Sequence, residues 1–246
     1  EFACSLPQLV TGELLEVSKG IECRTERIPL GVVASIVPFN FPAMVPNWTI
    51  PNAIALGNCM IIKPSEKVPL SIGKIAELLK EAGLPDGVLN IVHGEGPSCG
   101  EAIIKHPEIK AISFTGSTRA GERIASIAAP MFKKLSLELG GKNPNIIFAD
   151  CDYEKMLATT LLSSFSNQGQ ICLCGSRIFV ERKIYDRFKN DFVTKVKALT
   201  VGNPLDETTK IGAVVSKPHM EKILSYIELA KTEGGTILCG GQQLTM

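Results

Sequence analysis

The sequence lacks an excess of charge of either sign. Its 26 lysines and arginines are balanced by 25 aspartates and glutamates, which leaves a formal net charge of +1 over 246 residues. A chain this close to neutrality has neither the basic surface of a nucleic-acid-binding protein nor the polybasic patch that binds anionic lipid. We therefore expect no nucleic acid and no membrane among its partners.

Long hydrophobic runs are also missing. No apolar segment reaches the roughly 18 residues that span a bilayer, and the N-terminus lacks the charged and apolar segments of a secretory signal. The eight cysteines follow no disulfide-framework spacing, which favours reduced thiols in a cytosol-like compartment. These features together predict a cytoplasmic protein.

Histidine is scarce, with only His93, His106 and His219 in the chain. A structural zinc site needs cysteine and histidine pairs in two short-spaced clusters. Cys172 and Cys174 form a single isolated pair, far in sequence from the histidines. We expect no metal site.

What the sequence does contain is a regular alternation of short apolar segments and amphipathic ones. Hydrophobic residues make up 45% of the chain and charged residues 21%, as in ordinary globular proteins. The alternation predicts an α/β fold with a mostly parallel sheet and helices on its faces. The strands are expected at residues 32–37, 59–63, 88–92, 111–114, 135–138 and 146–148.

Other segments suggest how the chain is divided. Residues 1–10 read as the end of a helix, and residues 11–29 as an exposed hairpin around a Ser-Lys-Gly turn. Gly140 and Gly141 mark the expected boundary between a domain over residues 30–140 and a second over residues 141–246, which should end in a strand at 236–239. With no initiator methionine, the chain reads as a piece of a longer protein.

Three loops follow predicted strands and carry residues suited to binding a dinucleotide. The turn at 93–100 resembles a phosphate-binding glycine loop, but its spacing is one residue too long and Pro97 removes an amide, so a plain strand-to-helix turn is favoured. Gly116 and Ser117 suit either a phosphate contact or an ordinary helix cap. Lys63 and Glu66 suit either ribose hydroxyls or an exposed charged loop.

Three further residues suit catalysis. Cys172 lies in a polar turn that contains glycine, a better setting for a nucleophile than the apolar runs around other cysteines. Glu138 appears as a carboxylate inside an apolar strand, which must be either paired or functional. Asn40, among prolines and phenylalanines, is either a satisfied turn residue or an oxyanion donor.

Taken together, these motifs resemble the NAD(P)-dependent aldehyde dehydrogenase superfamily. They occur in the same order and with the same spacing as in that superfamily, and the resemblance covers essentially the whole chain. The segments that carry the resemblance are 38–42, 63–66, 114–118, 137–144 and 169–172. The resemblance implies a Rossmann-like cofactor domain followed by an α/β catalytic domain. It also implies that the hairpin at 11–29 takes part in oligomerisation, giving a homodimer or homotetramer.

The resemblance implies a thiol mechanism. Cys172 would attack the aldehyde, and Asn40 with the Cys172 amide would stabilise the resulting oxyanion. After hydride transfer to the cofactor, Glu138 would activate the water that hydrolyses the thioester.

The resemblance also implies a set of cofactor contacts. Lys63 and Glu66 match contacts to the adenosine ribose, and Gly116 and Ser117 match the contact to the pyrophosphate. A carboxylate at the ribose favours NAD over NADP, since it repels a 2′-phosphate. The other implied contacts are Phe39, which replaces the family's common tryptophan, Ser65, Gly96 in the glycine turn, and Leu139.

Two branches of the superfamily are similar to different parts of the chain. Segments before residue 46 resemble methylmalonate-semialdehyde dehydrogenases, which make an acyl-CoA and lack the glutamate found here at Glu138. Residues 135–143 and 168–174 resemble the muconic-semialdehyde branch. The expected reaction is therefore oxidation of a semialdehyde to a free acid. The alternatives are a CoA-acylating enzyme and a non-catalytic structural relative.

Overall fold

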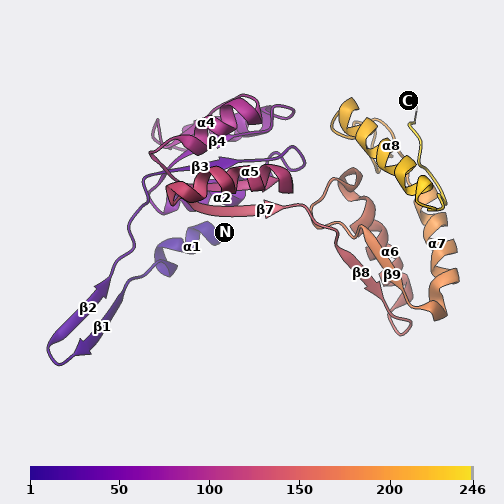
Figure 1. Ribbon diagram of the computed structural model, residues 1–246, viewed down its shortest axis with the longest axis horizontal. Coiled ribbons are helices and arrows are strands. Elements are labelled where there is room, and N and C mark those ends of the chain that lie inside the picture. Colours follow the sequence, from indigo (N-terminus) through magenta and orange to yellow (C-terminus); the bar gives the residue numbers. More distant parts are fainter. Residues whose placement is uncertain (245–246) are drawn as a thin grey trace. The chain divides into compact units, whose positions relative to one another are not determined.

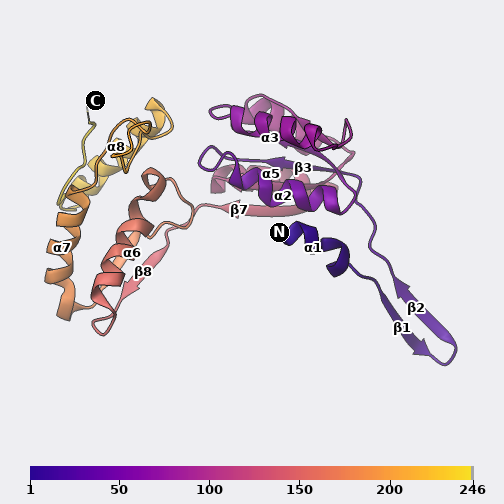
Figure 2. The same ribbon diagram turned by 180° about the vertical axis from the view of Figure 1, so that it is seen from behind.

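The computed structural model describes residues 1–244, and the chain divides into two compact units between Leu139 and Gly140. Each unit has its own sheet and its own hydrophobic core. We describe the two units separately. Figures 1 and 2 show their elements from opposite sides.

The first unit is built on a five-stranded sheet in the order β5-β4-β3-β6-β7. Every neighbouring pair is parallel, which confirms the predicted parallel sheet. The strands are β3 (Val32–Ile36), β4 (Cys59–Lys63), β5 (Leu89–Ile91), β6 (Ile109–Gly116) and β7 (Lys134–Leu139). The main connecting helices are α2 (Met44–Ala55), α3 (Leu70–Glu81), α4 (Glu101–Lys105) and α5 (Thr118–Ala128), with the short turns η1 (Gly96–Gly100) and η2 (Ala129–Met131).

The central strands bury apolar side chains on both faces of this sheet. Ala34 and Ile36 of β3 pack in one cluster with residues of β6, α4 and α5. Met60 and Ile62 of β4 pack in a second cluster with residues of α2 and α3. Helices on both faces explain why these strands read as nearly continuous apolar runs in the sequence.

The second unit contains a small parallel sheet and three longer helices. Its strands are β8 (Pro144–Ile147) and β9 (Arg177–Val180), and its helices are α6 (Tyr153–Phe165), α7 (Tyr185–Lys197) and α8 (Lys217–Thr232), with short turns η3 (Ser166–Gly169) and η4 (Arg182–Ile184). Ile147, Leu157 and Phe188 form its buried core, where the Phe188 and Phe192 rings stack with centroids 5.1 Å apart.

An aromatic and ionic cluster fastens α6 to α7. The Tyr153 hydroxyl donates a 2.7 Å hydrogen bond to Asp191, and the Arg187 guanidinium lies 3.7 Å from the centre of the Tyr153 ring. Burial, together with the bond to Asp191, raises the pKa of Tyr153 to about 12. The phenol therefore stays protonated and keeps its role as a donor.

The strand predicted at residues 236–239 is wrong. In the described residues this segment has no regular secondary structure, and β8 and β9 pair only with each other. A strand requires a neighbour to satisfy its amides, and apolar composition alone does not supply one. Gly234, Gly240 and Gly241, all with positive φ, bend the chain on either side of the segment.

The N-terminal part has the predicted helix and hairpin. Helix α1 (Phe2–Leu9) precedes β1 (Glu13–Ser18) and β2 (Ile21–Thr25), which pair antiparallel. Every residue of both strands is exposed. Across the described residues, we find no helix with the length and apolar character needed to cross a membrane.

Candidate active site

The carboxyl edge of the five-stranded sheet gathers most of the predicted site residues of the first unit. The parallel register aligns the last residue of β3, Ile36, with Lys63 of β4 and with Phe114 of β6. On the next pair, Thr115 lies opposite Glu138. Open α/β sheets bind ligands at this edge, so the topology places these residues where a cofactor is expected.

Lys63 ends β4 with a buried side chain, only 3% exposed. Its ammonium donates to the Pro64 carbonyl at 2.9 Å and lies 3.6 Å from a carboxylate oxygen of Glu66. A lysine has three N–H donors and is rarely buried without a partner. The sequence left an exposed loop open as an alternative, and the burial of Lys63 argues against it.

Ser65 and Glu66 continue the same turn with contrasting exposure. The Ser65 hydroxyl is buried and accepts from the Lys67 amide at 3.3 Å, which fixes the turn. The Glu66 side chain is 39% exposed, and one of its carboxylate oxygens lies 3.6 Å from the Lys63 ammonium. Lys67 lies over the Phe39 ring at 5.6 Å from its centre, which joins this turn to the turn after β3.

Asn40 lies half-buried in the turn between β3 and α2. The Val37 amide, at the start of this turn, donates to the Lys63 carbonyl at 3.1 Å and so ties the ends of β3 and β4 together. The helix that follows buries Val45 and Ile50 in the core. Asn40 is therefore carried on a turn that is fixed at both ends.

Gly116 and Ser117 join β6 to α5. Ser117 is the N-cap of α5, and its hydroxyl accepts from the Ala120 amide at 3.3 Å. A Cβ at Gly116 would lie 2.5 Å from the Phe114 ring, so glycine is required here by packing alone. The helix-cap interpretation is confirmed, and the pyrophosphate contact stays a prediction.

The glycine turn at 93–100 proves to be a tight strand-to-helix connection. Gly96 begins the π-helical turn η1, in which the amides of Cys99 and Gly100 donate to the Glu95 carbonyl. A Cβ at Gly94 would lie 2.6 Å from the Cβ of Cys99. These amides are engaged within the turn, and the predicted cofactor contact at Gly96 stays a prediction.

Glu138 differs from the expectation of a carboxylate inside an apolar strand. In β7 exposed residues alternate with half-buried ones, and Glu138 is exposed while Leu137 and Leu139 pack against the core. The face of β7 that carries Glu138 is therefore open to solvent, although β7 belongs to the parallel sheet. Leu139 closes over Gly121 of α5, where a Cβ would lie 2.8 Å from its side chain.

Cys172 lies half-buried in a hydrogen-bonded turn of the second unit. The Cys174 amide donates to the Ile171 carbonyl at 3.2 Å, which closes the turn around Cys172. The side-chain amide of Asn143 donates to the Cys172 carbonyl at 2.7 Å and to the Cys174 carbonyl at 3.1 Å. The turn that carries the thiol is therefore fixed by a residue 29 positions away in the sequence.

The chain just before this turn adopts an unusual conformation. Asn167 and Gln168 have φ values of 49° and 58°, and Gly169 follows at 72°. Left-handed conformations at two successive residues other than glycine are costly and concentrate at functional sites. Gln170 braces the segment further, since its side-chain oxygen accepts from the Val215 amide at 3.1 Å.

The sequence did not predict a structural role for Asn143 or Gln170. Asn143 stood in the 137–144 motif, and Gln170 in the 169–172 motif, as parts of a resemblance only. Their hydrogen bonds join segments distant in sequence and follow no periodic pattern. The only sequence feature that pointed to such a role was the presence of a side-chain amide in each motif.

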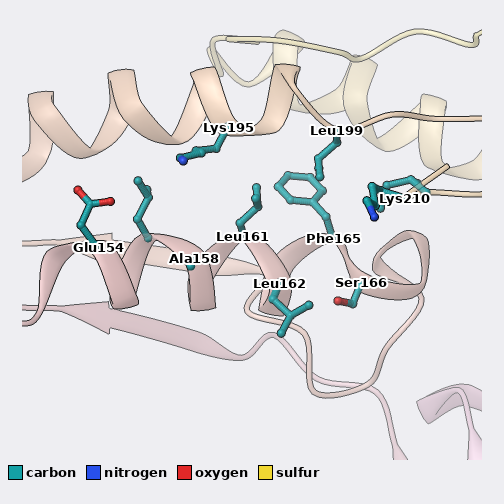
Figure 3. Close-up of a pocket in the computed structure, with 11 residues that line it drawn as sticks. Glu154, Ala158, Leu161, Leu162, Phe165, Ser166, Lys195, Leu199 and Lys210 are labelled. Atoms are coloured by element: carbon teal, nitrogen blue, oxygen red, sulfur yellow. The ribbon is translucent and has the colours of Figure 1, made fainter. Parts of the chain in front are cut away.

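A pocket of about 420 Å³ lies in the second unit, between α6 and α7. Figure 3 shows Leu161, Phe165 and Leu199 pointing toward one another inside it. Lys195 and Lys210 also line the pocket, as does Ser166 in the segment that leads to Cys172. Its lining suits a mainly apolar molecule.

The described residues contain no group of three or more histidines, cysteines, aspartates or glutamates able to hold a metal ion. All eight cysteines are free thiols.

Comparison with known proteins gives consistent matches. The model of the Aldehyde dehydrogenase family matches residues 1–246. A 2-aminomuconic semialdehyde dehydrogenase from Bos taurus is 51% identical over 216 residues, which cover 88% of this chain and 44% of that protein. A 4-trimethylaminobutyraldehyde dehydrogenase A from Danio rerio is 41% identical over 243 residues, covering 99% of this chain and 48% of that protein.

Solved structures agree with these matches. The NAD+ complex of an aldehyde dehydrogenase from Bacillus cereus has a TM-score of 0.97 at 39% identity, covering 100% of this chain and 50% of that chain. This similarity confirms the predicted α/β, Rossmann-like fold. The chain spans about half the length of the relatives that it matches.

Proposed function

This chain belongs to the aldehyde dehydrogenase family, and on that premise we propose that its protein oxidises an aldehyde to a carboxylic acid with NAD. The observation that carries the proposal is the setting of Cys172. Its thiol lies in a turn held by Asn143 and preceded by two residues in the left-handed conformation. A fixed turn gives a nucleophile a defined direction of attack.

The first chemical step belongs to Cys172. Its thiolate attacks the carbonyl carbon of the aldehyde, and the carbonyl oxygen becomes an oxyanion. Asn40 and the Cys172 amide donate hydrogen bonds to this oxygen. When the oxyanion collapses, a hydride leaves the former carbonyl carbon and a thioester to Cys172 remains.

The bound cofactor supplies one thing, an acceptor for that hydride. The carboxyl edge of the sheet suits the ribose of such a cofactor, because the buried Lys63 ammonium and the half-open Glu66 carboxylate lie side by side. Lys63 donates to ribose oxygens and Glu66 accepts from ribose hydroxyls. Ser65, Phe39, Gly96, Gly116, Ser117 and Leu139 are the further contacts we propose.

Glu66 is the basis for proposing NAD over NADP. The Glu66 carboxylate would accept a hydrogen bond from a 2′-hydroxyl, whereas it would repel a 2′-phosphate, which carries like charge. The NAD+ complex of the Bacillus cereus relative is consistent with this choice.

Glu138 completes the cycle as the general base. It removes a proton from water, the resulting hydroxide attacks the thioester carbon, and the Cys172 thiolate leaves with the bonding electrons. The exposure of Glu138 on the edge strand supports this role, since its substrate is water. A free acid is the product.

The proposed substrate is a semialdehyde. This choice rests on the 51% identity to a 2-aminomuconic semialdehyde dehydrogenase. The 41% identity to a 4-trimethylaminobutyraldehyde dehydrogenase makes an aldehyde with a cationic group the comparison to include in any substrate panel.

The decisive experiment compares two cysteine variants in the full-length protein. Cys172→Ala is expected to abolish NADH formation from an aldehyde, with a loss of about 10³-fold or more, because no other group replaces the thiol. Cys151→Ala, in the same unit and also half-buried, is the matched control and is expected to retain activity. Activity in Cys172→Ala equal to that of Cys151→Ala would refute Cys172 as the nucleophile, and a lack of activity in the unmodified protein would favour a non-catalytic relative.

A further inference from the structure

We propose that Asn143 is a positioning residue, whose carboxamide fixes the direction in which the Cys172 thiol points. The inference rests on the proposed function, since the direction of this thiol matters only if Cys172 is the nucleophile. It adds a role for a residue that contacts neither the reacting atoms nor the cofactor in that proposal.

Both N–H donors of the Asn143 amide are used on the turn that carries Cys172. Nδ2 lies 2.7 Å from the Cys172 carbonyl oxygen and 3.1 Å from the Cys174 carbonyl oxygen. Both bonds are partly buried, where losing a donor leaves the carbonyls without compensation from bulk water. A single side chain therefore holds two peptide groups of the same turn.

These bonds restrict the backbone rotation that sets the thiol. Fixing the Cys172 carbonyl limits ψ of Cys172, and the closing bond from the Cys174 amide to the Ile171 carbonyl limits the turn as a whole. The Ser176 amide donates to the Cys174 carbonyl at 2.8 Å and fixes the exit of the turn. These restraints hold the Cα–Cβ bond of Cys172 in place and so limit the directions open to its thiol, which then depend only on rotation about χ1.

Asn143 is itself rigidly held. Its own carbonyl accepts from the Arg177 amide at 3.2 Å, next to the β8–β9 pairing, and the Arg177 guanidinium donates to the Lys142 carbonyl at 2.8 Å. The Asn143 carboxamide is thus anchored to the small sheet of the second unit, and it transmits that position to the turn.

Gly141 supplies the space that the carboxamide occupies. A Cβ at residue 141 would lie 2.8 Å from Oδ1 of Asn143, closer than real contacts allow. Its φ is not in the left-handed region, so alanine fits the backbone and conflicts only with the amide. This gives a reason for the second glycine of the motif that is independent of any ligand.

The test is Asn143→Asp in the full-length enzyme. The substitution keeps the shape of the side chain but places an oxygen where Nδ2 donates, facing two carbonyl oxygens. Asn145→Asp is the matched control, since it introduces the same change two residues along the chain, where the amide donates to Thr160. The measurements are the rate of the first NADH burst, the KM for aldehyde, the Kd for NAD and the thermal midpoint.

The expected result is a burst slowed about tenfold or more in Asn143→Asp, because misplacing a reacting group by about 1 Å costs up to about 10²-fold. KM, Kd for NAD and the burst rate of Asn145→Asp should change by less than about threefold. A burst in Asn143→Asp as fast as in Asn145→Asp would overturn the inference, and so would a slowed burst accompanied by an equal loss in Asn145→Asp.

Two further variants keep the test decisive. If Asn143→Asp does not fold, Gly141→Ala displaces the same amide with no new charge, and an unchanged burst in that variant would overturn the inference. Cys172→Ala separates this inference from the proposed function. Activity that survives Cys172→Ala refutes the function itself, whereas activity lost there and retained in Asn143→Asp refutes the positioning role alone.

Discussion

Lys63 and Glu66, at the carboxyl edge of the sheet, differ in exposure, and this difference supports their proposed roles in binding a ribose. Lys63 is 3% exposed and Glu66 is 39% exposed, although they belong to one turn and form one ion pair. Burial holds the ammonium in place, while exposure leaves a carboxylate oxygen open to a ligand. This arrangement suits a ribose, which has oxygens that accept and hydroxyls that donate.

Lys63→Met tests this interpretation. Methionine fills a similar volume and lacks N–H donors, so the Kd for NAD is expected to rise about tenfold or more, as for the loss of a hydrogen bond from a charged group. Isothermal titration calorimetry measures it. Lys74→Met, which removes an exposed lysine paired with Glu77, is the control. An unchanged Kd in Lys63→Met would show that the lysine has a structural role only.

The sequence motifs supplied the candidate site residues, but they did not predict how exposed those residues are. The sequence left Lys63 open between a ligand contact and an exposed charged loop, and its side chain is buried; Glu138 was expected inside an apolar strand but is exposed. Leucines on both sides of Glu138 made the strand look apolar, yet side chains alternate between the two faces of a strand. Which face is covered depends on the neighbours of β7, and a sequence pattern alone does not contain that information.

Among the secondary-structure elements, α5 has an N-cap residue, Ser117, with both a structural role and a proposed binding role. Ser117 caps the helix through its bond from the Ala120 amide. Amides at the N-terminus of a helix also attract phosphate groups. The same side chain is therefore expected to affect both stability and cofactor affinity, and two substitutions separate the effects.

Ser117→Ala removes the cap and is expected to lower the free energy of unfolding by about 1 kcal/mol. Ser117→Asp retains a capping oxygen, so its stability should stay close to that of the wild type. Its negative charge should weaken NAD binding about tenfold or more, by repelling the pyrophosphate. Urea unfolding and NAD titration measure the two effects. NAD affinity in Ser117→Asp equal to that of the wild type would contradict the proposed contact.

Helices α4 and α5 are joined by an ion pair that gives a pH-dependent prediction. Glu101 lies 2.6 Å from the Lys105 ammonium and 2.9 Å from the Arg123 guanidinium. The hydrogen bonds from Lys105 and Arg123 hold the pKa of the Glu101 carboxyl below its ordinary value of 4.5. A carboxyl with a lowered folded-state pKa stabilises the fold above its unfolded pKa, and this contribution is lost as pH falls through the folded value.

Glu101→Gln is therefore expected to be less stable than the wild type at pH 7. The difference should shrink as pH falls below about 4.5, where the carboxyl of the unfolded wild-type chain begins to be protonated, and should vanish as pH falls through the lower pKa of the folded state. Urea midpoints at a series of pH values measure this difference. A gap between the two proteins that stays constant from pH 7 down to acid would contradict the assignment.

The elements themselves were largely predictable, and their exceptions have physical causes. Alternating apolar segments predicted the parallel sheet because helices cover both of its faces. The strand expected at 236–239 failed because apolar composition does not provide a pairing partner. The hydrogen bond from the Asn143 amide to the Cys172 carbonyl was not predictable, because it joins segments 29 residues apart and depends on the geometry of a side chain.

The whole molecule presents an exposed hairpin with two unlike faces. Leu15 pairs with Cys23 and shares its face with Val17, whereas Leu14 and Arg24 pair on the face that also carries Glu16 and Glu22. Leu15 and Val17 are both more than half exposed. An exposed apolar face on a two-stranded sheet is suited to burial against another chain. We therefore propose that the hairpin joins copies of the protein in a homodimer or homotetramer, as the family resemblance implies.

Replacing Leu15 and Val17 together by lysine is expected to lower the mass of the assembly at about 10 μM. The substitution places two charges on the proposed interface, where an unpaired buried charge is unfavourable. Glu22→Lys, on the opposite face, is the control. Light scattering after size-exclusion chromatography measures the mass. An assembly of unchanged mass would place the interface elsewhere.

The proposed oxidation of an aldehyde to a free acid through Cys172 can be decided by following the cofactor product. NADH formation by the full-length protein is followed over a panel of aldehydes and semialdehydes, with and without CoA. We predict turnover without CoA, highest for a semialdehyde and absent in Cys172→Ala. Turnover that requires CoA would contradict the assignment of Glu138 as the base for hydrolysis and would favour a CoA-acylating enzyme.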